Sequence, residues 1–435
     1  MSVMDAVVAA KLHLEQHGGL VNFDFPRDIV ADAAGKGHIV DELDYTRASE
    51  TLMVDASGVY HTFPPNAVAQ TNLGMKVSPV ITNLIPSTGL QGAVVGEVTN
   101  GGVGRLPTGW GYQANWVDQV FVVAIGSENG LPTIDIRIVL TAVGDTKYPY
   151  IYMGHPTVGA AGEAYTASLY RKTIGDKPDV SNGSSVPLQV AESSTIDGSI
   201  SHSVIQSFND ETDELTRYDT TYTLTKTGDI EQLIRSFYAT VLDGESIDTT
   251  IRFAAPQLEI GSYANDPVMT GEGVTGTSAA INVSDDISEF KLTQLSLYTE
   301  FNLLSFGEIQ GSIILEFSGA NSNLISFRRL DASDNIAYID VEQNAEFSFF
   351  PTHIPISTGN LKTLLTISDG KVKIFINGVL AGTQLLPRLS RDTDYAQINF
   401  GSSHHNNAEQ IIANFKKSVL YGIALDDAIC VELTT

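Results

Sequence analysis

The aromatic residues of this chain gather at two places where they could bind a sugar. Trp110 and Trp116, the two tryptophans of the chain, flank Tyr112. Trp110 lies between the Pro-Thr-Gly of 107–109 and a further glycine, so we expect it in a turn, and we expect Trp116 to enter the strand that follows. A second group recurs at every second position of a stretch with strand character: Tyr148, Tyr150 and Tyr152. Aromatic rings stack on the apolar faces of pyranoses, and neighbouring polar groups fix the orientation. These residues therefore form a candidate carbohydrate-binding site, and the alternative is that the rings pack in a core or at a subunit interface.

Oxygen ligands suited to calcium cluster in a short polar stretch. Asp331, Asp334 and Asn335 offer the carboxylate and amide oxygens that Ca²⁺ prefers. The same residue types favour a plain hairpin turn, because they accept tight backbone angles. The adjacent pair His404–His405 would diverge on an extended backbone and has no further ligand nearby. A structural calcium ion is thus the one cofactor that the sequence leaves open.

Motifs for catalysis are absent from the sequence. It contains no G-x-S-x-G, no H-E-x-x-H and no Walker loop. Glu128 and Asp135 flank a predicted turn. We expect them to keep this turn polar and to offer a surface ion-pair partner to Arg137, and we do not expect them to be the carboxylate pair of a glycosidase. The G-x-G-x-x-G match at 271–276 lacks the βαβ context of a dinucleotide site. The sequence therefore predicts a protein that is not an enzyme.

The charge of the chain restricts its partners. Its 435 residues include 51 acidic and 25 basic ones, and the formal net charge is −26. Such a chain repels nucleic-acid backbones, and it has no apolar stretch long enough to span a bilayer.

The single cysteine, Cys430, excludes an intramolecular disulfide. With no signal-peptide pattern at the start, we expect assembly in a reducing cytoplasm.

Strand patterns dominate the chain from about residue 97. Residues 134–138 alternate strictly between apolar and polar, which predicts a strand with one buried face. The clearest pattern is a meander over 364–383, whose strands are joined by Asp369-Gly370 and Asn377-Gly378. Such pairs tolerate the positive φ angles of type I′ turns. Lysines alternate with apolar residues in the middle strand, so one of its faces should be wet and the other buried: Lys371, Val372, Lys373, Ile374 and Ile376.

Helix patterns are rare. Ser2 and Asp5 resemble a capping box before an apolar period, and Gly18-Gly19 would end that helix. A single helical turn is expected near 229–234. The remaining residues up to about 95 are rich in proline and glycine, and they lack the periodic apolar content of a core. We therefore expect an N-terminal docking segment whose deletion leaves soluble, β-rich protein that no longer joins a larger assembly.

Three stretches resemble bacteriophage structural proteins. Asp-Tyr-Thr-Arg-Ala-Ser at 44–49, followed by Val-Asp-Ala-Ser-Gly-Val-Tyr at 54–60, is similar to a segment near the start of phage tail and virion proteins. The stretch 98–261, which closes on Ala-Pro-Gln-Leu-Glu-Ile-Gly, resembles the carbohydrate-binding-like sandwich of phage tail proteins. Residues 313–425, with the meander as marker, resemble a concanavalin A-like or laminin-G-like jelly roll.

The resemblance implies an all-β fold, with two antiparallel jelly-roll β-sandwiches in tandem behind a short N-terminal helix and a loop-rich docking segment. The expected divisions are a docking segment, a carbohydrate-binding-like sandwich, a linker and a concanavalin A-like sandwich: 1–95, 96–263, 264–280 and 281–435.

The resemblance also implies a function. It indicates a non-enzymatic phage virion protein, a tail fibre or adhesin, that docks through its N-terminal part and projects its sandwiches toward host-surface glycans. A capsid decoration protein and a glycan-cleaving depolymerase are the alternatives. The expected partners are other virion proteins and copies of the same chain, with a trimer favoured, and neither nucleic acid nor membrane is expected. The expected location is the virion, assembled in the host cytoplasm.

Overall fold

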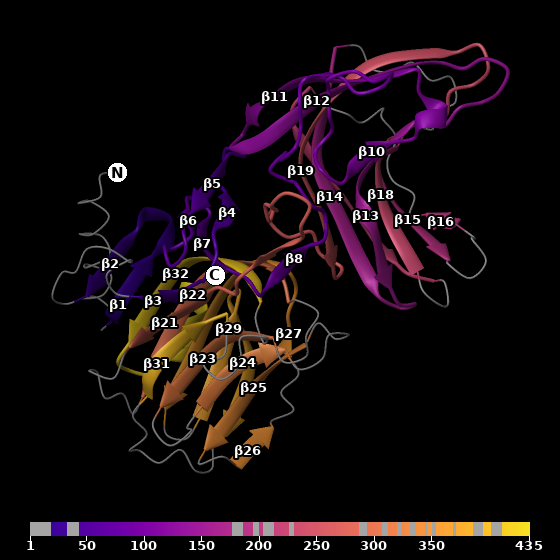
Figure 1. Cartoon of the computed structure of the whole chain (residues 1–435). Coiled ribbons are helices and arrows are strands. Elements are labelled where there is room, and N and C mark those ends of the chain that lie inside the picture. Colours follow the sequence, from indigo (N-terminus) through magenta and orange to yellow (C-terminus); the bar gives the residue numbers. More distant parts are fainter. Residues whose placement is uncertain are drawn as a thin grey trace. The chain divides into compact units, whose positions relative to one another are not determined.

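The computed structural model describes most of the chain (Figure 1). The described ranges are 19–32, 43–175, 186–194, 200–202, 213–225, 230–286, 294–306, 312–319, 324–329, 336–343, 346–349, 354–368, 371–385, 395–401 and 411–435. Four sequence predictions lie outside these residues: the N-terminal helix, the calcium loop at 331–335, the turn at 369–370 and the pair His404–His405.

The described chain is almost entirely antiparallel β-structure, which confirms the predicted fold class. It divides into two compact units. Residues 1–80 and 279–435 make up one, called here the terminal unit, and residues 81–278 make up the other, the inserted unit. No described helix has the length and apolar character needed to cross a membrane.

The terminal unit contains a long sheet, sheet I, to which both ends of the chain contribute. In hydrogen-bonding order its strands are β2 (Ile29–Asp32), β1 (Gly19–Asp24), β32 (Ile412–Tyr421), β22 (Leu295–Ser305), β28 (Gly359–Ser368), β29 (Lys371–Ile376) and β30 (Val379–Leu385). Two short strands continue it beside β32: β7 (Gly74–Val77), which pairs with β32, and β6 (Gln70–Thr71), which pairs with β7.

A second sheet, sheet II, faces sheet I in the same unit. Its order is β26 (Glu346–Phe349), β25 (Ile336–Gln343), β24 (Leu324–Arg329), β23 (Ile313–Gly319), β31 (Tyr395–Phe400), β21 (Asn282–Asp286) and β3 (Asp44–Thr46), and β27 (Ile354–Pro355) pairs with β25. A separate hairpin joins β4 (Thr51–Val54) to β5 (Tyr60–Phe63), and a short 3-10 helix, η1, covers Phe25–Arg27.

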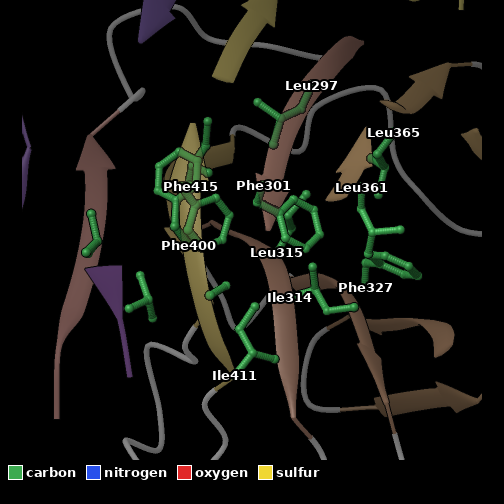
Figure 2. Close-up of a cluster of buried hydrophobic side chains, with 14 of the residues drawn as sticks. Leu297, Phe301, Ile314, Leu315, Phe327, Leu361, Leu365, Phe400, Ile411 and Phe415 are labelled. Carbon is green, nitrogen blue, oxygen red and sulfur yellow. The ribbon is translucent and has the colours of Figure 1, made fainter. Parts of the chain in front are cut away.

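Apolar side chains from both sheets form the core of the terminal unit (Figure 2). The Phe415 ring of sheet I contacts aromatic rings of both sheets, with its centroid 5.2 Å from that of Phe301 in sheet I and 5.5 Å from that of Phe400 in sheet II. Phe23 and Phe25, from the start of the chain, stack on each other at 5.9 Å and both meet Phe400 edge-on. The described strands near the start of the chain therefore contribute to this core, and they are not a loop-rich segment without core residues.

The segment Asp-Tyr-Thr-Arg-Ala-Ser has a structural role in this unit. Arg47 is 2% exposed, and its guanidinium donates hydrogen bonds to the carbonyl oxygens of Phe63 and Ala67, each at 3.2 Å, and also to that of Pro64. Its backbone N–H donates to Asn66 Oδ1 at 3.1 Å. A single arginine thus orders the proline-containing loop that follows β5, because a buried carbonyl without a donor would be costly.

The outer face of sheet I is covered by a helix that the sequence reading missed. Helix α2 (Asp427–Thr434) begins at Asp426, whose carboxylate accepts a hydrogen bond from the N–H of Ile429 at 3.0 Å. Lys373 of β29 pairs with Asp427 at 2.5 Å. A second apolar cluster includes Cys430 of the helix and residues of the sheet and of the segment before the helix: Tyr298, Leu364, Phe375, Val419, Tyr421 and Leu425. The lysine-bearing face of β29 is therefore only partly wet.

The predicted meander is otherwise confirmed. Strands β28, β29 and β30 pair in succession, and Val372 and Ile374 are fully buried. Asn377 and Gly378 adopt φ angles of 45° and 80°, the positive values that a type I′ turn requires.

Replacement of Gly378 by valine is expected to destabilise the terminal unit by about 1–3 kcal/mol, because a β-branched residue resists positive φ. A Cβ at this position would also lie 2.7 Å from Thr435 Oγ1. Gly58→Val is the matched control, since Gly58 has a φ of 82° but open space around it. Thermal melting should show the larger loss for Gly378→Val, and an unchanged melting temperature would contradict the turn assignment.

The inserted unit is a second sandwich. Sheet III has the order β17 (Thr216–Thr223), β14 (Ala164–Ile174), β19 (Ser246–Ile260), β12 (Leu131–Thr141), β11 (Gln119–Glu128) and β9 (Gly96–Glu97). Sheet IV has the order β10 (Trp110–Tyr112), β13 (Tyr150–Gly159), β18 (Ile230–Tyr238), β15 (Val186–Ser194) and β16 (Ile200–His202). Apart from these, β8 (Ile81–Asn83) pairs with β20 (Gly276–Ser278), and Ala114–Trp116 forms the 3-10 helix η3.

Two sequence predictions in this unit are wrong. The expected helical turn at 229–234 falls mostly in β18, which pairs on both sides, with β13 and with β15, so that ladder hydrogen bonds replace helical ones. The expected linker at 264–280 is part of the inserted unit up to residue 278. Glu259, 2% exposed, accepts hydrogen bonds from the backbone N–H of Asn265 at 2.9 Å and from Gln257 at 2.8 Å.

The motif Ala-Pro-Gln-Leu-Glu explains this anchoring. Ala255 has a φ of 44° and sits at a break in the pairing register of β14 with β19. The break reverses which side chains point inward, so that Leu258 joins the core while Gln257 and Glu259 bind the following loop. Burial raises the pKa of Glu259, although hydrogen bonds from Asn265 and Gln257 oppose the shift.

Candidate functional site

The structure separates the predicted aromatic residues into two groups. Trp110 is 8% exposed and packs in the core of the inserted unit, where its Nε1–H donates to the carbonyl of Pro86 at 3.2 Å. It begins strand β10, whereas the sequence reading placed it in a turn. Tyr112, two positions on, packs partly buried against the same core. Trp110 and Tyr112 therefore pack in or against the core of the inserted unit.

The second group lies together on the outer side of sheet IV and is called here the aromatic cluster: Trp116, Tyr148, Tyr150 and Tyr152. The Trp116 ring meets Tyr148 at 5.4 Å and Tyr150 at 6.0 Å between centroids, with interplanar angles of 68° and 70°. Tyr150 and Tyr152 are 6.4 Å apart. The structure thus joins Trp116 to the tyrosine row, although the two stretches are more than thirty residues apart.

Strand geometry explains the placement of the row. Ile151 and Met153 of β13 point into the core, so Tyr152 between them points outward. Trp116 lies in η3 rather than in the strand that was predicted for it, and β11 begins only at Gln119. Trp116, Tyr148 and Tyr152 are partly exposed, while Tyr150 is 9% exposed. The cluster therefore presents three accessible rings around one buried ring.

Two residues of this site were missed by sequence reasoning. Gln113 supports the cluster through two hydrogen bonds to Tyr150. Its side-chain oxygen accepts from the Tyr150 hydroxyl at 3.5 Å, and its backbone N–H donates to the Tyr150 carbonyl at 3.2 Å. Gly111 lies directly opposite Tyr152 in the ladder between β10 and β13. A glycine between two aromatic residues was the only signal in the sequence for this position.

The mutual contacts fix the rings before any ligand binds. Edge-to-face aromatic pairs contribute about 0.5–1.5 kcal/mol beyond the area they bury. Rings held in this way lose little conformational freedom when a ligand arrives, which favours binding. The arrangement can offer ring faces and edges to the C–H groups of a sugar, with the amide of Gln113 alongside as a polar neighbour.

The carboxylates considered for glycoside hydrolysis are held in ion pairs. Arg252 binds Asp135 through Nε and Nη2 at 2.7 and 2.8 Å and reaches Glu128 at 2.7 Å. Lys172 pairs with Glu128 at 2.6 Å, and Arg137 pairs with Asp248 at 2.6 Å instead of with either predicted carboxylate. Burial would raise the pKa of Glu128, but Lys172 and Arg252 together hold it below its ordinary value. A general acid requires the opposite shift.

Metal ligands do not converge in the described part of the chain. No group of three or more His, Cys, Asp or Glu residues there could hold a metal ion. The calcium candidates Asp331, Asp334 and Asn335 lie outside the described residues, so that prediction stays a prediction.

Comparisons with known proteins give only distant similarities. No family model and no curated protein match the sequence. Among solved structures, the carbohydrate-binding module CBM40 of a Ruminococcus gnavus IT-sialidase is 12% identical over 35% of this chain and 93% of that chain, with a TM-score of 0.28.

Two further structures show the same level of similarity. Domain 4 of AbnA, a GH43 extracellular arabinanase from Geobacillus stearothermophilus in complex with arabinotriose, is 14% identical over 40% of this chain and 81% of that chain, with a TM-score of 0.30. A heptameric SAP-like pentraxin from Limulus polyphemus is 16% identical over 33% and 70%, with a TM-score of 0.27. At these TM-scores the similarities carry no argument about function.

Proposed function

We propose that this chain is a non-enzymatic structural protein of a bacteriophage virion, of the tail-fibre or adhesin type, and that its inserted unit recognises a host-surface glycan. The observation that carries the glycan part is the aromatic cluster: three partly exposed rings and one buried ring fixed together on the outer side of sheet IV. Aromatic rings of this kind are the usual partners of sugar C–H faces.

The virion part of the proposal rests on the order of the three resembling segments along the chain. Attachment to the particle is proposed for the terminal unit, which contains the N-terminal segment. The non-enzymatic part is supported by the ion pairs that occupy Glu128 and Asp135. Cryo-EM of purified particles tests the assignment, and particles that lack the chain would contradict it.

Substitution of Trp116 by alanine is expected to weaken glycan binding by about thirtyfold, which corresponds to the ~2 kcal/mol of a central aromatic contact. The expected fall in melting temperature is modest, because Trp116 is only partly buried and its removal costs mainly the two edge-to-face contacts with Tyr148 and Tyr150. Binding of the purified full chain to a glycan array and to host cells provides the measurement.

Phe121→Ala is the matched control for that test. Phe121 is also a partly buried aromatic residue of the inserted unit, but it lies in sheet III. The Arg137 guanidinium lies over its ring, with Cζ 5.6 Å from the ring centroid. The control should leave binding unchanged. If Trp116→Ala binds as the unmodified chain does, the cluster is not a sugar site.

A further inference from the structure

The ring of Tyr152 lies across the backbone of the neighbouring edge strand. Gly111 and Tyr152 are direct partners in the ladder between β10 and β13, and β10 is the terminal strand of sheet IV among the described strands. A Cβ built on Gly111 would lie 2.2 Å from Cζ, 2.2 Å from the hydroxyl oxygen and 2.7 Å from Cε2 of Tyr152. The hydroxyl end of the ring therefore occupies the space that any other residue at position 111 would need.

The need for glycine at this position does not come from the backbone. Gly111 is absent from the positive-φ glycines of the described chain, so an alanine could adopt its backbone conformation. The three nearest atoms all belong to the far end of the Tyr152 side chain, which can rotate, so the fold could accept a methyl group if the Tyr152 ring moved. The absence of a side chain at position 111 therefore determines which orientations are open to the Tyr152 ring.

We propose that Gly111 is a positioning residue of the candidate glycan site: because it lacks a side chain, the Tyr152 ring can extend over β10 and join the aromatic cluster. This inference rests on the proposed function. Tyr152 reaches the cluster through Tyr150, 6.4 Å away, so a rotation of Tyr152 alters one end of the ring surface and leaves the Trp116 contacts in place. Gly111 would then set how much of a sugar chain the cluster can contact.

A purely structural reading of the same contact exists. An aromatic ring packed over an edge glycine can compensate for the weak strand preference of glycine, and this device stabilises sheets without any ligand. That reading predicts that Gly111→Ala changes stability and leaves glycan binding unchanged. The positioning reading predicts the reverse, so the two can be separated by measuring both quantities.

The test is a double-mutant cycle in the full chain with Gly111→Ala, Tyr152→Ala and the combined variant, read by glycan affinity on the array ligand and by thermal melting. We expect Gly111→Ala to weaken binding roughly threefold to tenfold, the size of one aromatic contact, with nearly unchanged melting. The combined variant should bind no more weakly than Tyr152→Ala, because the glycine acts through the ring.

Each outcome decides one point. Additive losses in the combined variant, or an unchanged affinity of Gly111→Ala while Tyr152→Ala weakens binding, would overturn the positioning role and leave the glycan function intact. Unchanged affinity in Tyr152→Ala and in Trp116→Ala together would overturn the proposed function itself. Tyr152→Phe, which keeps the ring, serves as the conservative variant and should retain most of the affinity.

Discussion

Removal of residues 1–80 is expected to prevent the terminal unit from folding, although the remaining chain keeps residues 279–435 intact. The deleted segment supplies β1 and β7, which pair along one side of β32, and β3, which pairs with β21 of sheet II. It also removes Tyr45, Ala69 and six Val, Leu, Met or Phe side chains from the core: Val21, Phe23, Phe25, Leu43, Met75 and Val77.

This loss is comparable with the whole stability of a domain. Each such side chain contributes about 1.5–3 kcal/mol when it is buried, so the segment accounts for about 10 kcal/mol or more, against a total stability of roughly 5–15 kcal/mol. Circular dichroism and thermal melting provide the measurement. This expectation reverses the one drawn from sequence, that truncation leaves soluble, β-rich protein.

A single substitution gives a finer version of the deletion. Phe23→Ala removes one ring that stacks on Phe25 and meets Phe400, and it should cost about 3–5 kcal/mol. If the truncated chain retains a cooperative melting transition for the terminal unit, and Phe23→Ala melts normally, the N-terminal strands are not part of this core.

The parts of the fold that could be predicted are those with a local sequence pattern. The meander was readable because its three strands follow one another directly and Asn377-Gly378 marks a turn of known geometry. The alternation over 134–138 likewise corresponds to fully buried Ile134, Ile136 and Ile138 in β12. In each case the pairing partners or the buried face follow from neighbours close in sequence.

Long-range pairing explains what could not be predicted. Tyr45 pairs with Val283, and Val77 pairs with Ala413, so these short N-terminal strands find their partners more than two hundred residues away. A three- or four-residue strand has too few positions to show a period. The N-terminal segment therefore looked loop-rich, and the division of the chain at residue 80 left no local sign.

The candidate site divides in the same way. Tyr150 and Tyr152 share a face because they alternate along β13, and this was predictable from spacing. The approach of Trp116 depends on η3 and on the pairing of β10 with β13, which spacing does not reveal. The prediction of a turn at Trp110 was wrong because the turn ends where the strand begins. The backbone N–H of Trp110 donates to the Pro107 carbonyl at 2.9 Å, and Trp110 is also the first residue of β10.

Trp110→Ala is expected to destabilise the inserted unit by about 3–5 kcal/mol, as truncations of large buried aromatic residues do. For a unit of this size the melting temperature should fall by roughly 10 °C. The indole is 8% exposed, packs in the core and donates to the Pro86 carbonyl, so its removal leaves both a cavity and a buried acceptor without its donor.

Two further variants show which part of Trp110 matters. Trp110→Phe keeps most of the ring volume and loses the hydrogen bond, so it should cost about 1–2 kcal/mol. Trp116→Ala removes the other tryptophan of the same unit from a partly exposed position and should lower the melting temperature less than Trp110→Ala does. The opposite result, with a stable Trp110→Ala chain that has lost glycan binding, would mean that Trp110 belongs to the sugar site and not to the core.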